Sequence, residues 1–336
     1  MQNHSFTYCI VSSLLITVLC GTGSCKKDSD NQTASQYRLT ASNYYENDTL
    51  KTADAFQYLG DRINLVRSCY YTTEEDSIKT EIEYKDENNI EQVSYFKFAS
   101  QWYAIEKILM QKQNGRLVRV EDRYFDGSYW DDMFKMEYSY TSGNLTEEVL
   151  YYHEFSSWTP EEKISYEYEG GKPARAFYYD YDNDWVMNYK EDASYTGDKI
   201  ESITGYIYVD SSFSTDARYE YQYTGNLLMN IKVHLYNAGW EYAGDMAFTY
   251  DSHGKLETES AIGSTFSKKY EYTYEEGVGN FAQFVLPGGG LIPVKAYPVP
   301  VKSSPASFNR RTNGSEMFKS RTFGNQTSPI LNSRLN

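Results

Sequence analysis

The sequence predicts an all-β protein, an antiparallel meander of two-strand repeats of about 28 residues that curls into a barrel or a coiled sheet. Two series of residues repeat with this period. The first series is a turn, and its members are Gly60, Asn88, Gly115, Gly143, Gly171, Gly197, Gly225, Gly254 and Gly277. The second series is out of phase with the turns, and its members are Trp102, Trp130, Trp158, Trp185, Phe213, Trp240 and Phe266. Two independent series on one period indicate a repeat protein.

Within each repeat, apolar and polar residues alternate, which is the period of a strand. Ile164, Tyr166 and Tyr168 fall on one face, and the residues between them are polar. The Gly and Asn residues of the turn tolerate positive φ and reverse the chain. A second strand follows, and a looser loop carrying Trp or Phe leads to the next repeat. Nine turns therefore predict roughly sixteen to eighteen strands.

A meander of this length is not expected to stay flat, because strand twist accumulates and open edges promote aggregation. The first aromatic residue of each repeat, such as Tyr138, Tyr166 or Tyr221, is expected in the core. Strand length and alternation also suit a membrane-spanning barrel. Against that alternative, the apolar face is mostly Tyr and the other face is dense in Glu and Asp.

The N-terminus carries the features of a signal peptide. Residues 10–19, IVSSLLITVL, are apolar but too few to span roughly 30 Å of hydrocarbon. Small residues, Thr22-Gly23-Ser24, precede Cys25, and this segment resembles a bacterial lipobox. The resemblance implies that residues 1–24 are a lipoprotein signal peptide and that Cys25 is acylated, with palmitate among its chains. Cys20 is the alternative, but Leu19 before it is too large.

Two further resemblances concern the mature chain. The polar run that starts at Cys25, CKKDSD, resembles the charged export signal of Bacteroidetes surface lipoproteins, which implies the outer face of the outer membrane. The Tyr-rich repeats over residues 50–285 resemble the tyrosine-aspartate (YD) repeats of large secreted bacterial proteins. They are more similar to a group of Bacteroidetes lipoproteins with a porin-like fold, which implies the barrel.

Charge divides the chain into segments. We expect a polar tether over residues 25–36, a β-hairpin repeat domain over 37–285, and a partly disordered Pro/Gly-rich basic tail over 286–336. The net charge is -15, and residues 281–336 hold seven Lys or Arg against the single acid Glu316. The tail is therefore +6 and residues 26–280 are -21, so the tail either docks on the acidic body or stays disordered. The acidic balance argues against nucleic acid as a partner.

One acidic loop has oxygen-bearing side chains at the spacing of a metal-binding loop. Its oxygens fall at positions 1, 3, 5, 9 and 12 of a calcium loop of the EF-hand kind, at Asp180, Asp182, Asp184, Asn188 and Glu191. Trp185 stands where such a loop needs Gly. The loop is therefore either a solvated acidic turn or a site of weak calcium affinity, and no other cofactor is expected. A catalytic metal or nucleophile motif is not found, so we do not expect an enzyme.

The Trp and Phe series is the best candidate for a binding surface. Residues at one place in successive repeats should align along one rim, where aromatic rings suit sugars or peptide side chains. These rings are Trp102, Trp130, Trp158, Trp185, Phe213 and Trp240. The alternative is that each ring packs over its own hairpin. The sequence thus predicts a surface lipoprotein that binds glycan or protein without catalysis. The alternatives are a structural spacer and a glycoside hydrolase.

Overall fold

The computed structural model describes residues 37–60, 62–70, 77–263 and 267–276, and these residues form eighteen strands in one sheet. The predicted signal peptide, Cys25, the predicted tether, the markers Phe266 and Gly277, the last predicted part of the repeat domain (277–285) and the basic tail lie outside the described residues. The strands are β1 Tyr37–Glu46, β2 Thr49–Leu59, β3 Arg62–Tyr70, β4 Ser77–Tyr84, β5 Asn89–Phe98, β6 Gln101–Gln113, β7 Arg116–Phe125, β8 Trp130–Thr141, β9 Asn144–Glu154, β10 Ser157–Glu169, β11 Lys172–Tyr181, β12 Trp185–Thr196, β13 Lys199–Val209, β14 Ser212–Thr224, β15 Leu227–Tyr236, β16 Trp240–Tyr250, β17 Leu256–Gly263 and β18 Ser267–Glu276.

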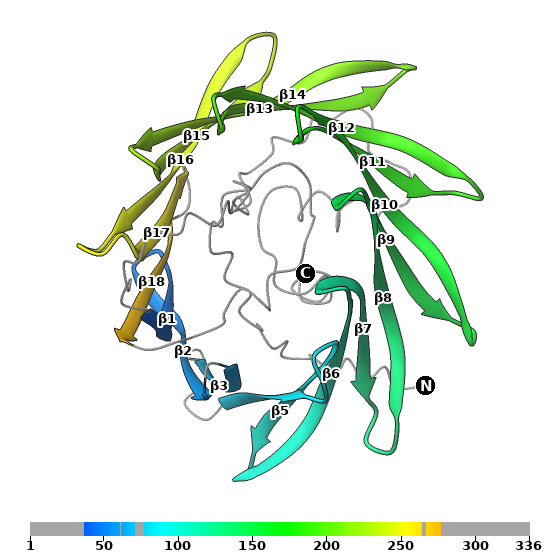
Figure 1. Cartoon of the computed structure of the whole chain (residues 1–336), viewed down its shortest axis with the longest axis vertical. Helices are drawn as coiled ribbons and strands as arrows, with labels where there is room; N and C mark the ends of the chain where they lie inside the picture. The colour runs from blue at the N-terminus through cyan, green and yellow to red at the C-terminus, as the bar shows by residue number, and fades with distance from the viewer. Residues whose placement is uncertain (1–36, 61, 71–76, 264–266, 277–336) are drawn as a thin grey trace, which may run out of the picture.

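The sheet is a closed antiparallel barrel. Each strand pairs with its neighbours in the sequence, and β1 also pairs with β18, from Tyr37 opposite Glu276 to Glu46 opposite Lys268. Figure 1 shows the resulting ring of strands. The all-β meander predicted from the sequence is therefore confirmed in its closed form. No helix long and apolar enough to cross a membrane occurs in the part of the chain that the structure describes.

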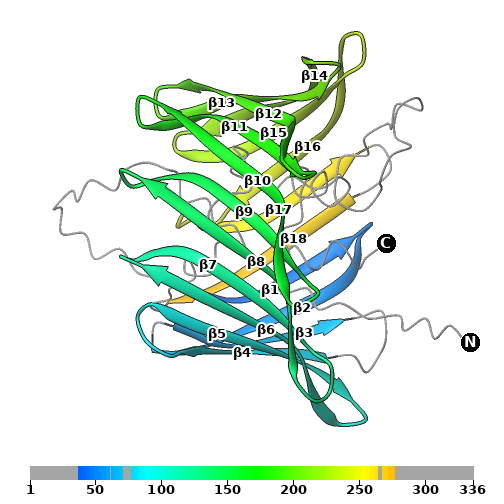
Figure 2. The same cartoon turned by 90° about the vertical axis from the view of Figure 1, so that its right-hand side faces the viewer.

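The two series of sequence markers lie at opposite ends of the barrel. Connections that follow even-numbered strands form one end, which we call the glycine rim, and Gly115 and Gly143 there have φ of +76° and +92°. Connections that follow odd-numbered strands form the other end, which we call the aromatic rim. The strands slant between the two rims in Figure 2. Since β1 begins and β18 ends beside the glycine rim, the segments that flank the barrel leave from that end.

The connections of the aromatic rim differ from the predicted loose loops. Four of them are two-residue turns in which both residues have positive φ, for example Ala99 and Ser100, or Phe155 and Ser156. Trp158 lies in the strand that follows, opposite His153. The prediction erred because these turns lack the Gly that normally marks positive φ.

One face of the sheet is buried along its whole length. Tyr178, Tyr219 and Ile231 are exposed to 1%, 0% and 0%. Residues on the convex side of a barrel have no strand above them, so side chains this deeply buried lie on the inner face. The outer face carries the alternating polar residues. An unpaired cysteine is usually buried. Cys69 is instead exposed on the outer face, because its neighbour Ser68 points inward.

The repeated pattern of an aromatic residue, any residue and then Tyr has a structural reason. The first aromatic residue, such as Tyr166, packs in the inner core. The second is half-buried, and its hydroxyl donates to a backbone carbonyl of the preceding hairpin. Tyr168 donates to Leu145 O at 2.9 Å, and Tyr140 donates to Leu117 O at 2.9 Å. The same bond is made by Tyr58, Tyr195 and Tyr250, so these Tyr residues tie their hairpins to the ones before them.

Gly205 on β13 makes room for the ring of Tyr189 on β12. A Cβ at this position would lie 1.8 Å from Tyr189 Oη and 2.7 Å from Cζ. We expect Gly205→Ala to lower the free energy of unfolding by about 1–3 kcal/mol, because the buried ring must move. Gly239→Ala, whose Cβ meets nothing within 4 Å, should change it by less than about 0.5 kcal/mol. Urea unfolding measures both, and equal effects would contradict the close approach.

Candidate functional site

The six aromatic residues of the predicted series lie on the outer face, near the starts of successive even-numbered strands. Five contact an aromatic or His ring of the preceding strand in a tilted or edge-to-face geometry. The ring centroids are 4.9–5.3 Å apart in Trp158 with His153, Trp185 with Tyr181, Phe213 with Tyr208, and Trp240 with Tyr236. Trp130 pairs in the same way with Phe125, at 5.0 Å. The series is therefore a ladder of cross-strand pairs beside the aromatic rim, as the spacing predicts.

A lysine of the outer face lies against most rings of this ladder. Lys163 Nζ is 4.7 Å from the ring centroid of Tyr179 and 4.7 Å from that of Trp185. Lys135 Nζ is 4.2 Å from Tyr151 and 5.4 Å from Trp158. Cations at these distances from an aromatic face are attracted by the ring quadrupole. These rings therefore hold neighbouring hairpins together. The lysines cover the ring faces on which a ligand would otherwise stack.

The lysines of the ladder were not singled out from the sequence, although they repeat with the same period. They are Lys79, Lys107, Lys135, Lys163 and Lys190, spaced by 28, 28, 28 and 27 residues. A search for Lys two strands before each Trp would have found them. Among the residues that the structure describes, no Lys or Arg lies over the ring of Trp240, which is 42% exposed.

Removing one ladder cation should weaken the barrel modestly. We expect Lys163→Gln to lower the free energy of unfolding by about 1 kcal/mol, because it removes a cation from two rings. Lys232→Gln on β15 is the matched control and should change the free energy by less than about 0.5 kcal/mol. Chemical denaturation of both variants tests this, and a control effect as large as that of Lys163→Gln would refute the cation–π role.

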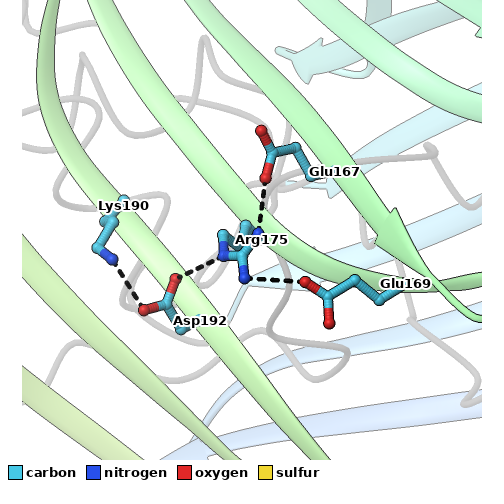
Figure 3. A network of polar contacts seen from close by, with 5 residues as sticks. All are labelled: Glu167, Glu169, Arg175, Lys190 and Asp192. Atoms are coloured by element: carbon cyan, nitrogen blue, oxygen red, sulfur yellow. Dashed lines mark hydrogen bonds and ion pairs between the residues drawn. The ribbon is translucent and has the colours of Figure 1, made fainter.

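Ion pairs cover the outer face between the ladder lysines. Arg175 bonds Glu167 at 2.9 Å and Glu169 at 2.8 Å, and its Nε lies 3.8 Å from Asp192 Oδ1. Lys190 bonds the other oxygen of Asp192 at 2.8 Å, and Figure 3 shows this network across β10, β11 and β12. Partly exposed pairs of this kind add little stability. They do make the outer wall strongly charged.

Exposed apolar side chains gather at one end of the barrel. Within the described ranges, every exposed large apolar residue except Leu59 lies within a few residues of an aromatic-rim connection. These residues are Phe98, Trp102, Tyr103, Tyr129, Phe155, Tyr181, Val186, Tyr208, Val209, Phe213, Tyr236, Trp240, Tyr242 and Ile262. A concentration of apolar side chains on one surface, interspersed with polar turn residues, is typical of an interaction site.

Phe155 departs most from ordinary turn chemistry. Its side chain is 100% exposed, and its backbone has φ of +48°, where a bulky residue is disfavoured. Neither packing nor turn geometry explains a Phe here. Strained and exposed residues of this kind cluster at functional sites. Exposed rim residues whose rings carry no ladder lysine, such as Phe98, Tyr129 and Phe155, thus join the predicted series as binding candidates.

The residues of the predicted calcium loop point to different places. Asp180 lies on β11 opposite Glu162, and Glu191 is fully buried on β12. Asp182 and Asp184 belong to the exposed connection between those strands, and Asp184 accepts a bond from the backbone of Trp185 at 2.8 Å. No group of three or more His, Cys, Asp or Glu suited to a metal is found among the described residues.

Glu191 instead lies among buried tyrosines. Burial first, and then the charge of Glu191, raises the pKa of Tyr178, Tyr219 and Tyr221 well above the usual value. All three phenols are therefore neutral at physiological pH. Glu161 nearby has its pKa raised by burial first and then by Asp180.

The comparisons with known proteins give structural neighbours only. No family model matches the chain, and no curated protein does. A protein of unknown function from Bacteroides fragilis aligns over 34% of this chain and 91% of its own, at 16% identity and a TM-score of 0.32. Porin-like proteins from Bacteroides uniformis and Bacteroides vulgatus each align over 70% of this chain and 98% of their own, at 9% identity and TM-scores of 0.37 and 0.35. The chain's own residues define a closed β-barrel with one aromatic rim.

Proposed function

We propose that the chain is a lipid-anchored cell-surface protein that binds glycans at its aromatic rim and does not catalyse a reaction. The observation that carries this proposal is the concentration of exposed aromatic residues on one rim. Aromatic faces stack on sugar rings, and Asp, Asn and Ser side chains of the connecting turns are suited to sugar hydroxyls. Asp126, Asp182 and Asp210 lie in such turns.

The direction of the chain supports this arrangement. β1 begins at the glycine rim, so a tether from Cys25 would bring that rim toward the membrane. The aromatic rim would then face away from the cell. The charged outer wall supports a barrel surrounded by water, because Lys and Arg on a lipid-facing wall cost about 2–4 kcal/mol each near the bilayer centre.

Binding to a glycan array tests the proposal. The variant Phe98→Ser, Tyr129→Ser, Phe155→Ser removes three exposed rim side chains that are 65%, 56% and 100% accessible, so it should leave the fold intact. We expect the wild-type protein to bind a subset of glycans and this variant to bind them at least tenfold more weakly. Leu59→Ser, at the glycine rim, is the matched control and should bind as wild type.

Two results would count against glycan binding. Binding that persists in the triple variant would place the ligand elsewhere. If the folded wild-type protein binds no glycan on the array, a structural spacer or a protein-binding module would be favoured instead.

The anchor is tested separately in cells fed an alkyne analogue of palmitate. We expect label on the wild-type chain and on Cys20→Ser, and none on Cys25→Ser. Label that persists in Cys25→Ser would contradict acylation at this residue.

A further inference from the structure

The inner face of the barrel is unbalanced in charge. Over the described ranges, six carboxylates and no Lys, Arg or His side chain are buried on it, and Lys112 and Lys268 of the same face are only partly buried. The carboxylates are Asp54, Glu106, Asp122, Glu148, Glu162 and Glu191. Five of them lie on strands β6 to β12, and we call this part of the inner face the acidic wall. Hydroxyl groups bond some of them, as Tyr166 bonds Glu148 and Ser94 bonds Glu106, but a hydrogen bond from a neutral donor leaves the negative charge in place, and cations would be attracted to this wall.

The width of the barrel makes room for an occupant. Barrels of roughly sixteen to eighteen strands are too wide for side chains of opposite walls to fill. Tyr178 and Tyr219, in the neighbourhood of Glu191, are nevertheless exposed to only 1% and 0%. The opposite wall of so wide a barrel is too far away to cover these two Tyr side chains. Their burial therefore indicates that another part of the protein, or a ligand, occupies the interior.

A buried hydroxyl provides a second, independent sign of a ligand. Tyr221 is 7% exposed, and its Oη has no hydrogen-bond partner. The charge of Glu191 contributes to the raised pKa of Tyr221, so the two groups are close together on the inner face. A hydroxyl buried without a partner is costly, and an incoming polar group would satisfy it.

The same chain contains a segment of matching charge. β18 ends at Glu276 beside the glycine rim, and residues 277–336 follow it directly. They hold seven Lys or Arg and only one acid, Glu316. Sixty residues (336 − 276) can reach far beyond a strand of about ten residues, which spans roughly 33 Å. Length therefore does not limit access to any part of the interior.

We propose that the basic segment, residues 277–336, binds inside the barrel along the acidic wall. Its cations would compensate the buried carboxylates, and its backbone would offer partners to groups such as the Tyr221 hydroxyl. This inference does not depend on the aromatic rim or on the proposed glycan binding. It leaves the rim free for a partner.

Cleavage of the intact protein tests this proposal. A recognition sequence for a specific protease is inserted between Gly279 and Asn280 of the full chain, and the cleaved protein is run on gel filtration. We expect the two pieces to elute together at about 50 mM salt and separately at about 1 M salt, because salt screens charge pairing. Circular dichroism checks that the barrel keeps its β spectrum.

Substitutions locate the contact. Arg310→Gln, Arg311→Gln, Lys319→Gln, Arg321→Gln should weaken retention of the tail at least tenfold. A matched set of neutral changes, Ser303→Gln, Ser304→Gln, Ser307→Gln, Thr312→Gln, should not. On the barrel, Glu148→Gln, Glu162→Gln should weaken retention, whereas the outer-face pair Glu167→Gln, Glu169→Gln should leave it unchanged. The tail variant leaves the wall untouched, so it remains informative if the inner variant fails to fold.

Three outcomes would overturn the proposal. The first is release of the tail at low salt from a barrel that stays folded. The second is retention lost with the outer pair but not with the inner pair, which would place the tail on the outside. The third is a barrel that releases its tail but is stabilised by added polylysine, which would indicate a cationic partner from another molecule.

Discussion

Tyr219→Ala is expected to lower the free energy of unfolding by about 3–5 kcal/mol, the largest effect among the single substitutions considered. The side chain is fully buried and packs in the inner core with Ala217, Tyr221 and Ile231. Its removal takes away a large buried ring and leaves a cavity that a closed sheet cannot collapse. For a domain of this size the melting temperature should fall on the order of 10 °C.

The control for this substitution is Tyr236→Ala. Tyr236 is 46% exposed and contacts Trp240 on the outer face near the aromatic rim. Its loss should cost no more than about 1 kcal/mol. Thermal unfolding of both variants measures the two losses of stability. A small effect at Tyr219 would mean that the inner face is not the core of the protein.

Asp54→Asn is expected to stabilise the protein at pH 7.5 by about 2–3 kcal/mol. Asp54 is 3% exposed, and burial raises its pKa to about 6, although hydrogen bonds from Ser68 and Ser42 oppose the shift. The Ser42 hydroxyl donates to Asp54 Oδ2 at 3.1 Å. An Asn amide can keep both serine contacts without a charge.

The sign of the pH dependence follows from the raised pKa. The folded state holds the proton of Asp54 more tightly than the unfolded state, whose pKa is about 3.9. The folded state is therefore favoured by this group below about pH 4, and that contribution is lost as the pH rises to about 6. Above pH 6 the charged carboxylate is buried at a cost that Asn does not incur.

Urea unfolding between pH 4 and pH 8 tests this expectation. The gap between Asp54→Asn and the wild-type protein should grow with pH and level off above about pH 6. Asp198→Asn, on an exposed carboxylate paired with Lys172, should show little effect. Destabilisation by Asp54→Asn at pH 7.5, or a gap that does not vary with pH, would contradict a buried charge at this position.

Much of the fold could be predicted from local patterns. The alternation around Tyr166 gives the strands, and the turn at Gly143 gives their reversal, because both depend on neighbouring residues only. Closure could not be predicted, because a coiled open sheet has the same local pattern. It depends on the pairing of β1 with β18, for example between Arg38 and Glu275, 237 residues apart in the sequence.

The candidate site shows a similar division. The period of the Trp series correctly predicts one aligned ladder, but not that Lys163 lies against Trp185, since these residues are on different hairpins. The exposure of Phe155 could not be predicted either, because a Phe-Ser turn with positive φ has no sequence signal. The spacing from Asp180 to Glu191 suggested one shared site, whereas Glu191 is fully buried on the inner face and Asp182 and Asp184 lie in the exposed connection.

Thiol labelling on intact cells tests the outward orientation of the aromatic rim most directly. Two variants carry a single exposed cysteine in a Cys69→Ser background, Phe155→Cys at the aromatic rim and Asp198→Cys at the glycine rim. With a membrane-impermeant maleimide, we predict rapid labelling of Phe155→Cys and several-fold slower labelling of Asp198→Cys. Faster labelling of Asp198→Cys, or no labelling of either variant until the cells are lysed, would contradict an anchored barrel that presents its aromatic rim to the outside.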